Sequence, residues 1–180
     1  MNELKLSDIK QGLPGVSSIE GDNLYENCMV ELHRHGHSSP TKLQVISDND
    51  VDLDVLWKDD FNSQLDRTYA DRQSSVERSA VCISILLALR FTNYTVIERS
   101  RKGTGFDYML GYKEDIFYNP KARLEISGIS EETNSNTLNK RFEQKSRQTD
   151  ISDSTNMPAY ISVVEFKTPK SIFKIKTTKV

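Results

Sequence analysis

The sequence SSVERSAVCISILLALR, residues 74–90, carries the strongest helix signal in the chain. Apolar residues recur in it at helical spacing, and Ser74 with Glu77 three residues later matches the capping box that opens many helices. Leu86 and Leu89 make a second side of the segment apolar. We therefore expect a helix that is packed deeply against the rest of the fold.

Apolar and β-branched runs follow this helix and predict strands. Ala159–Phe166 is the most β-branched run in the chain, which favours a central strand. The predicted order is helix, strand, strand, strand, helix, strand, an α/β fold built as an α+β sandwich. The elements expected after residue 90 are strands at Tyr94–Glu98, Phe106–Gly111, Ala122–Ile129 and Ala159–Phe166, and a helix from Asn136 or Thr137 to Gln148.

The sequence before this core divides into two parts. Residues 1–25 contain glycine, proline and serine at short intervals, which indicates a loose N-terminal arm. Residues 26–60 alternate turn-rich segments with β-like runs and predict an antiparallel β-meander. We expect residues 26–180 to form one domain whose meander extends the sheet or contacts a protein partner or a second copy. The three runs of the meander are Cys28–Arg34, Lys42–Ile46 and Val51–Trp57.

Length and composition exclude several classes of protein. The 180 residues suit one domain, and 36% hydrophobic content is typical of a folded chain. No run of 18 apolar residues occurs, so we expect no membrane span, and the first ten residues show no secretory signal, which favours the cytoplasm. Cys28 and Cys82 lack the spacing of a zinc site and predict reduced, structural thiols.

Charge is distributed unevenly along the chain. Residues 1–66 contain 5 Lys and Arg against 13 Asp and Glu, whereas residues 67–180 contain 19 against 13. The basic part suits a polyanion such as nucleic acid, and a solvated charged face is the alternative.

Acidic residues inside predicted strands suggest a site. Asp107 lies in GFDYML and Glu125 in RLEISG, and carboxylates are seldom buried without a partner. Adjacent strands would bring both to one face, and Glu77 at the start of the helix could reach the same corner. Three such carboxylates require a raised pKa or a cation. Magnesium is typical of such sites, where it activates water and stabilises charge on a phosphate.

This order of elements, with Glu77 in the first helix, Asp107 in the second strand and Glu125 in the third, resembles the PD-(D/E)XK restriction-endonuclease-like superfamily. The resemblance covers about residues 73–170. It implies that Mg²⁺ or Mn²⁺ is held by these three carboxylates and by the Ile126 carbonyl oxygen.

The chain departs from that superfamily at one position. A lysine two residues after the Glu normally helps to activate water, and here Ser127 occupies that position. The resemblance points to Lys145 on the following helix as a migrated lysine, with Gln148 one turn further on. The phosphate backbone of nucleic acid is expected to bind a basic face at Arg141, Arg147 and Lys170.

The resulting hypothesis is a magnesium-dependent nuclease that cleaves phosphodiester bonds in nucleic acid, in a bacterial or phage setting such as restriction, repair or defence. Ser127 motivates an alternative, a catalytically inactive adaptor or protein-binding module on the same fold. A second alternative is a small-nucleotide phosphodiesterase, because the positive charge is modest.

A rival register for the catalytic group uses Glu165 and Lys167, a literal Glu-x-Lys at the end of an apolar run. Asp153 lies upstream of it at a permissible distance. Residues two apart on a strand share a face, so the pairing is physically sound. However, Asp153 lies in turn-like sequence, and this register leaves Asp107 and Glu125 unexplained.

The histidines His33, His35 and His37 alternate in the segment HRHGH. In an extended strand they would share one face and could bind zinc. The turn residues Gly36 and Pro40 favour the other interpretation, in which the three rings are scattered.

Overall fold

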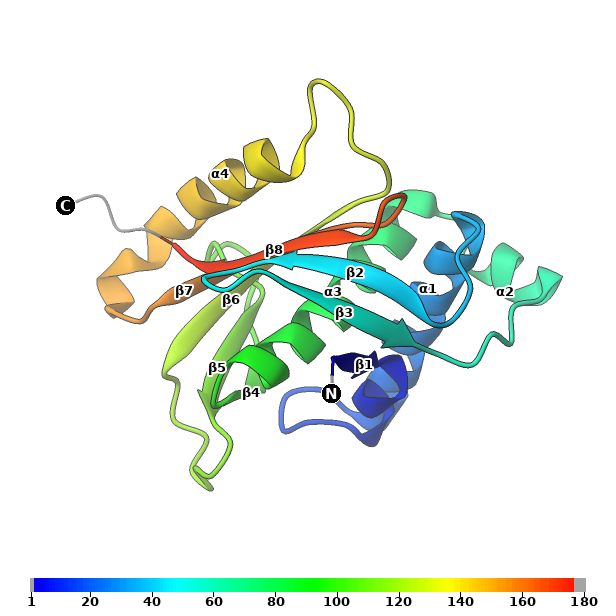
Figure 1. Cartoon of the computed structure of the whole chain (residues 1–180). Helices are drawn as coiled ribbons and strands as arrows, with labels where there is room; N and C mark the ends of the chain where they lie inside the picture. Colours follow the sequence, from blue (N-terminus) through cyan, green and yellow to red (C-terminus); the bar gives the residue numbers. More distant parts are fainter. Residues whose placement is uncertain (1, 177–180) are drawn as a thin grey trace.

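The computed structural model describes residues 2–176, so the last four residues of the predicted domain lie outside the described part. These residues form an α/β fold around a mixed eight-stranded sheet (Figure 1). The two edge strands of the sheet are β1 and β4. In spatial order the strands are β1 (Glu3–Lys5), β3 (Val51–Leu56), β2 (Thr41–Ile46), β8 (Lys170–Ile175), β7 (Ala159–Glu165), β6 (Ala122–Ile129), β5 (Tyr108–Tyr112) and β4 (Tyr94–Arg99).

Helices cover both faces of the sheet (Figure 1). Gly128 of β6 contacts Val76 of α3, whereas Glu125, three residues earlier, contacts Lys145 of α4. Successive strand residues point to opposite faces, so α3 and α4 lie on opposite sides of the sheet. The helices are α1 (Ser18–Arg34), α2 (Ser63–Thr68), α3 (Arg72–Phe91) and α4 (Leu138–Gln148), with 3-10 helices η1 (Leu6–Gln11) and η2 (Thr149–Thr155).

The elements predicted after residue 70 are confirmed within a few residues. The apolar helix is α3, β6 has the predicted bounds, and β7 lies inside the sheet between β6 and β8. β6 and β7 run parallel, from the pair Arg123 and Ala159 to the pair Ile129 and Glu165. The basic segment after β7 forms the further strand β8, which joins β7 to β2.

The predicted three-stranded meander is wrong in its first strand, because Cys28–Arg34 belongs to α1. Ser17 caps this helix by accepting a hydrogen bond from the Glu20 N–H, and Leu24, Cys28 and Leu32 are buried at helical spacing. The remaining antiparallel hairpin, β2 and β3, extends the sheet as expected. Because β2 pairs with β8 and β3 pairs with β1, both sides of the hairpin are occupied by this chain over part of their length.

The predicted loose arm at residues 1–25 is also wrong. Leu6 and Ile9 of η1 are fully buried in the main hydrophobic cluster. The crossing of η1 and α1 is so close that a Cβ at Gly21 would collide with the Ile9 carbonyl. The N-terminal segment is therefore an integral part of the core.

The helix α3 begins three residues earlier than a Ser74 cap implies. Its N-cap is Asp71, whose side chain accepts a hydrogen bond from the Ser74 N–H. Glu77 consequently lies in the second turn, where it accepts a 3.4 Å hydrogen bond from Gln73 Nε2. Among the described residues, no helix is long and apolar enough to cross a membrane.

Candidate active site

The candidate site lies at the point where the hydrogen-bonded pairing of β5 with β6 ends. Their pairing runs from Leu110 and Ala122 to Tyr108 and Leu124, and the Asp107 N–H donates a last hydrogen bond to the Leu124 carbonyl at 2.9 Å. Beyond this point β6 pairs only with β7. The Asp107 side chain occupies the open edge of β6, where its Oδ2 accepts a 2.8 Å hydrogen bond from the Ile126 N–H.

Glu125, next to Ile126, is 1% exposed and receives two side chains from α4. Its Oε1 lies 2.6 Å from Lys145 Nζ and accepts a 2.9 Å hydrogen bond from Gln148 Nε2. Lys145 also donates to Gln148 Oε1 at 3.1 Å. Glu125 Oε2 is buried and has no hydrogen-bond partner in the described part of the chain. This oxygen is therefore unsatisfied while Glu125 and Asp107 are both ionised, whereas a protonated Glu125 would donate a hydrogen bond to Asp107.

The charge of Glu125 is disfavoured by its surroundings. Burial, and after it the adjacent Asp107 carboxylate, raise the pKa of its carboxyl group to about 8, against a lowering by Lys145. The site therefore favours the protonated form of Glu125 more strongly than water does, although Lys145 opposes this preference. A cation bound between the two carboxylates would reverse this preference.

A cavity of about 270 Å³ opens over this edge of β6, between α3 and α4. Asp107, Ile126 and Lys145 line it, and arginines from three elements line it as well: Arg78 of α3, Arg99 of β4 and Arg141 of α4. A small polar cavity that combines carboxylates with several arginines can accommodate both a cation and an anion.

Glu77 lines the same cavity but does not complete the predicted group of three carboxylates. Within residues 2–176, no three His, Cys, Asp or Glu side chains lie close enough together to hold a metal ion. The physical reason is the position of Glu77 on an exposed face of α3, where its partner is Gln73. The structure thus brings together Asp107 and Glu125, and leaves Glu77 at the rim.

The three predicted phosphate-binding residues have different positions. Arg141 lines the cavity, with its guanidinium held by Asn136 Oδ1. Arg147 does not, because its side chain is 80% exposed on α4 and lies near Glu143. Lys170 begins β8 opposite Glu165, at the far end of β7, and is not a lining residue.

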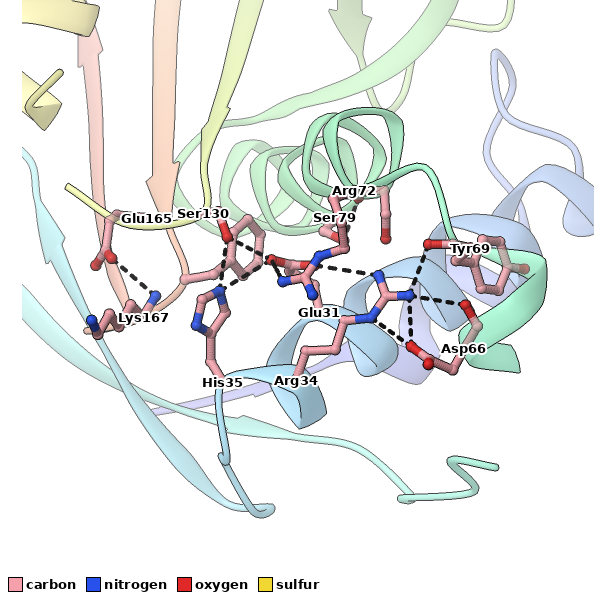
Figure 2. A network of polar contacts seen from close by, with 12 residues as sticks. Glu31, Arg34, His35, Asp66, Tyr69, Arg72, Ser79, Ser130, Glu165 and Lys167 are labelled. Carbon is pink, nitrogen blue, oxygen red and sulfur yellow. Dashed lines mark hydrogen bonds and ion pairs between the residues drawn. The ribbon is translucent and has the colours of Figure 1, made fainter. Parts of the chain in front are cut away.

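The rival register is not assembled. Asp153 lies beside the start of β6, where it contacts Arg123 at 3.1 Å and Lys176 at 2.7 Å. Glu165 ends β7 and accepts 2.9 Å hydrogen bonds from the backbone N–H groups of Lys167 and Thr168 (Figure 2). Glu165 therefore stabilises a turn, and the Lys167 ammonium pairs with Glu131 instead.

A separate polar network surrounds Glu31 at the end of α1 (Figure 2). Glu31 is fully buried, accepts a 3.0 Å hydrogen bond from Ser130 Oγ, and lies 3.1 Å from His35 Nε2. Arg72 and Arg34 lie near its carboxylate, at 3.6 and 3.8 Å. This network ties α1 to the start of α3 and to the segment that follows β6.

The three histidines do not gather at one point, although the His35 and His37 ring centroids lie 6.5 Å apart. His33 stacks on Phe61 and lies 3.2 Å from Asp59, whereas His37 Nε2 lies 2.8 Å from the Phe166 carbonyl. With His35 held in the Glu31 network, the three rings contact different groups. Cys28 and Cys82 are buried free thiols, as predicted.

Two cavity residues, Arg78 and Arg99, were not singled out from the sequence. The only signal was the density of basic residues in RSRKG at 99–103. The chain matches no known protein-family model, no curated protein and no solved structure. The geometry of the site is therefore the basis for any functional proposal.

Proposed function

We propose that this protein is a nuclease that uses a divalent cation to cleave phosphodiester bonds, with Asp107, Glu125, Lys145 and Gln148 as its catalytic group. One observation carries the proposal: the carboxylate of Glu125 on β6 and that of Asp107, just before β5, lie together at an open sheet edge beside a cavity lined with arginine. A purely structural ion pair would need neither the second carboxylate nor the cavity. The chain order α3, β4, β5, β6, α4, β7 supports the proposed likeness to the restriction-endonuclease fold.

The residues at this edge fit Mg²⁺ or Mn²⁺. Glu125 Oε2 is a buried oxygen without a hydrogen-bond partner, and like-charge repulsion from Asp107 would be relieved by a cation. The N–H and C=O of one strand residue point to the same side of the strand. Since the Ile126 N–H points to Asp107, the Ile126 carbonyl oxygen is a suitable third ligand. A bound divalent cation would lower the pKa of water and stabilise phosphate charge.

The chain's own groups have distinct tasks in this proposal. Lys145 lies at hydrogen-bond distance from Glu125 and lines the cavity, so its ammonium replaces the lysine expected at Ser127. There it would orient the attacking water or stabilise the developing charge on the phosphate. Gln148 contacts both Lys145 and Glu125 and so fixes their relative position.

A second candidate is a catalytically inactive module on the same fold. The 2.6 Å contact between Lys145 and Glu125 favours it, because that ion pair already compensates the buried carboxylate without a metal. The two candidates differ in one measurable property, the cleavage of a phosphodiester bond in the presence of Mg²⁺ or Mn²⁺.

The test is cleavage of labelled single-stranded and duplex DNA and RNA in Mg²⁺ or Mn²⁺. Asp107→Asn keeps the hydrogen bond to Ile126 and removes the charge. We expect it to lower the rate by about 100-fold or more, because metal-ion catalysis is worth several kcal/mol. Glu143→Gln, on the exposed face of α4, is the matched control and should cleave normally. No cleavage by the wild type would favour the inactive module, and equal rates would remove Asp107 from the mechanism.

A further inference from the structure

Two of the cavity arginines lack an acidic partner. Arg99, at the end of β4, and Arg141, on α4, both line the cavity, and neither forms an ion pair with a carboxylate of residues 2–176. Asn136, a neutral amide, holds Arg141 at 2.9 Å. Arg78 differs, because Glu20 at 2.8 Å compensates its charge. The cavity therefore has two uncompensated guanidinium groups from two different elements.

The loop between β4 and β5 extends this positive surface out of the cavity. Arg101 and Lys102 are exposed, follow Arg99 after Ser100, and also have no ion pair in the described chain. The loop is held beside the site at two points. The Ser100 N–H donates to the Asp107 carbonyl at 2.7 Å, and Gly105 packs so closely on α4 that an added Cβ would lie 2.5 Å from the Gln148 carbonyl oxygen.

The rest of the molecule makes this arrangement distinctive. β4 is one edge strand of the sheet, and β3, which carries the exposed Asp52 and Asp54, lies beside β1, the edge strand at the other side. Most of the width of the sheet therefore separates these two aspartates from the cavity arginines, so they do not oppose a polyanion that approaches the cavity.

We propose that Arg99, Arg101, Lys102 and Arg141, together named the basic rim, bind successive phosphates of a polynucleotide. The inference rests on the proposed function and specifies its substrate as a nucleic-acid chain instead of a mononucleotide. Arg99 and Arg141 lie beside the carboxylates and would hold the phosphate to be cleaved, since the guanidinium fork matches phosphate oxygens. Arg101 and Lys102 lie outside the cavity, where only a neighbouring phosphate of the same chain would reach them.

The experiment measures binding without cleavage, by fluorescence anisotropy of labelled 20-nucleotide DNA and RNA, single-stranded and duplex, in EDTA. Each phosphate contact contributes about 0.7–0.9 to the slope of log affinity against log salt. Arg99→Gln and Arg141→Gln should therefore each weaken binding about five- to tenfold at 0.1 M salt and lower that slope by about one. Arg147→Gln is the matched control, because Arg147 lies on α4 outside the cavity, and it should bind like the wild type.

Competition separates the possible ligands. Unlabelled 20-mer should displace the probe at far lower concentration than adenosine monophosphate or poly-glutamate. The inference is overturned if the wild type does not bind at 50 mM salt, if the rim variants bind like Arg147→Gln, or if either competitor equals the 20-mer. Because EDTA prevents metal-dependent cleavage, an inactive protein that still shows this binding pattern would contradict the proposed function and support the basic rim.

Discussion

Glu31 and Glu125 are both buried, both belong to hydrogen-bond networks, and both have a carboxylate oxygen without a hydrogen-bond partner in the described residues. Their neighbours differ in charge. Glu31 lies among Arg34, Arg72 and His35, and no second carboxylate of residues 2–176 contacts it (Figure 2). Among residues 2–176, Glu125 contacts one cation, Lys145, and lies beside a second carboxylate, Asp107, which lines the cavity.

This difference is the reason for proposing Glu125, and not Glu31, as a functional carboxylate. Burial and an unsatisfied oxygen are common to both residues and do not distinguish them. A second carboxylate beside a cavity does distinguish Glu125. Repulsion between two carboxylates is costly, so a bound cation or a functional role is needed to explain why both are present. Glu165 supports the same conclusion, since its buried carboxylate is explained by two backbone N–H groups.

The largest expected change in stability comes from a substitution of Glu31. Glu31→Gln would leave the nearly buried Arg34 without its nearest internal carboxylate, although Asp66 still contacts it. We expect the free energy of unfolding to fall by about 2–4 kcal/mol, as when one partner of a buried ion pair is removed. Urea denaturation measures this. A loss below about 0.5 kcal/mol, typical of a surface position, would show that the network is not structural.

A smaller effect is expected from Glu125, in the pH dependence of folding stability. Because the pKa of Glu125 is raised from 4.5 to about 8, the unfolded chain loses this proton at lower pH than the folded protein. The stability contributed by this group is therefore complete below about pH 4.5 and is lost as pH rises to about 8.

Asp107→Asn removes one cause of that raised pKa and keeps the acceptor for the Ile126 N–H. We expect the variant to lose less stability than the wild type between pH 5 and pH 8, by about 1 kcal/mol or more. Urea denaturation at both pH values, with Glu143→Gln as the control, gives the difference. Identical pH dependence in the wild type and Asp107→Asn would mean that the two carboxylates do not interact.

Much of the site could be predicted from the sequence because its signals are local. Asp107 and Glu125 are acidic residues in apolar, strand-like sequence, although Asp107 lies just before β5, and Lys145 and Gln148 lie three apart on a helix with a clear start at Thr137. These four side chains meet as expected. Glu77 does not join them, because α3 is apolar on more than one side and the sequence does not determine which residues face the open edge.

Other features of the fold and the site could not be predicted, because they depend on contacts between residues far apart in the sequence. Cys28–Arg34 reads as a β-like run in isolation, and only the Ser17 cap and the spacing from Leu24 to Leu32 identify α1. The uncompensated charge of Arg99 and the compensated charge of Arg78 have no sequence signature, because the partner of Arg78 is 58 residues away.

The most direct test of the central claim is a calorimetric titration of the wild type and Asp107→Asn with Mg²⁺ and Mn²⁺. We expect saturable binding to the wild type at pH 8, weakening by up to about tenfold for each pH unit below the Glu125 pKa of about 8, since the cation displaces its proton. Asp107→Asn should lose this binding. No binding to the wild type, or equal binding to both proteins, would contradict the assignment of Asp107 and Glu125 as a cation-binding pair.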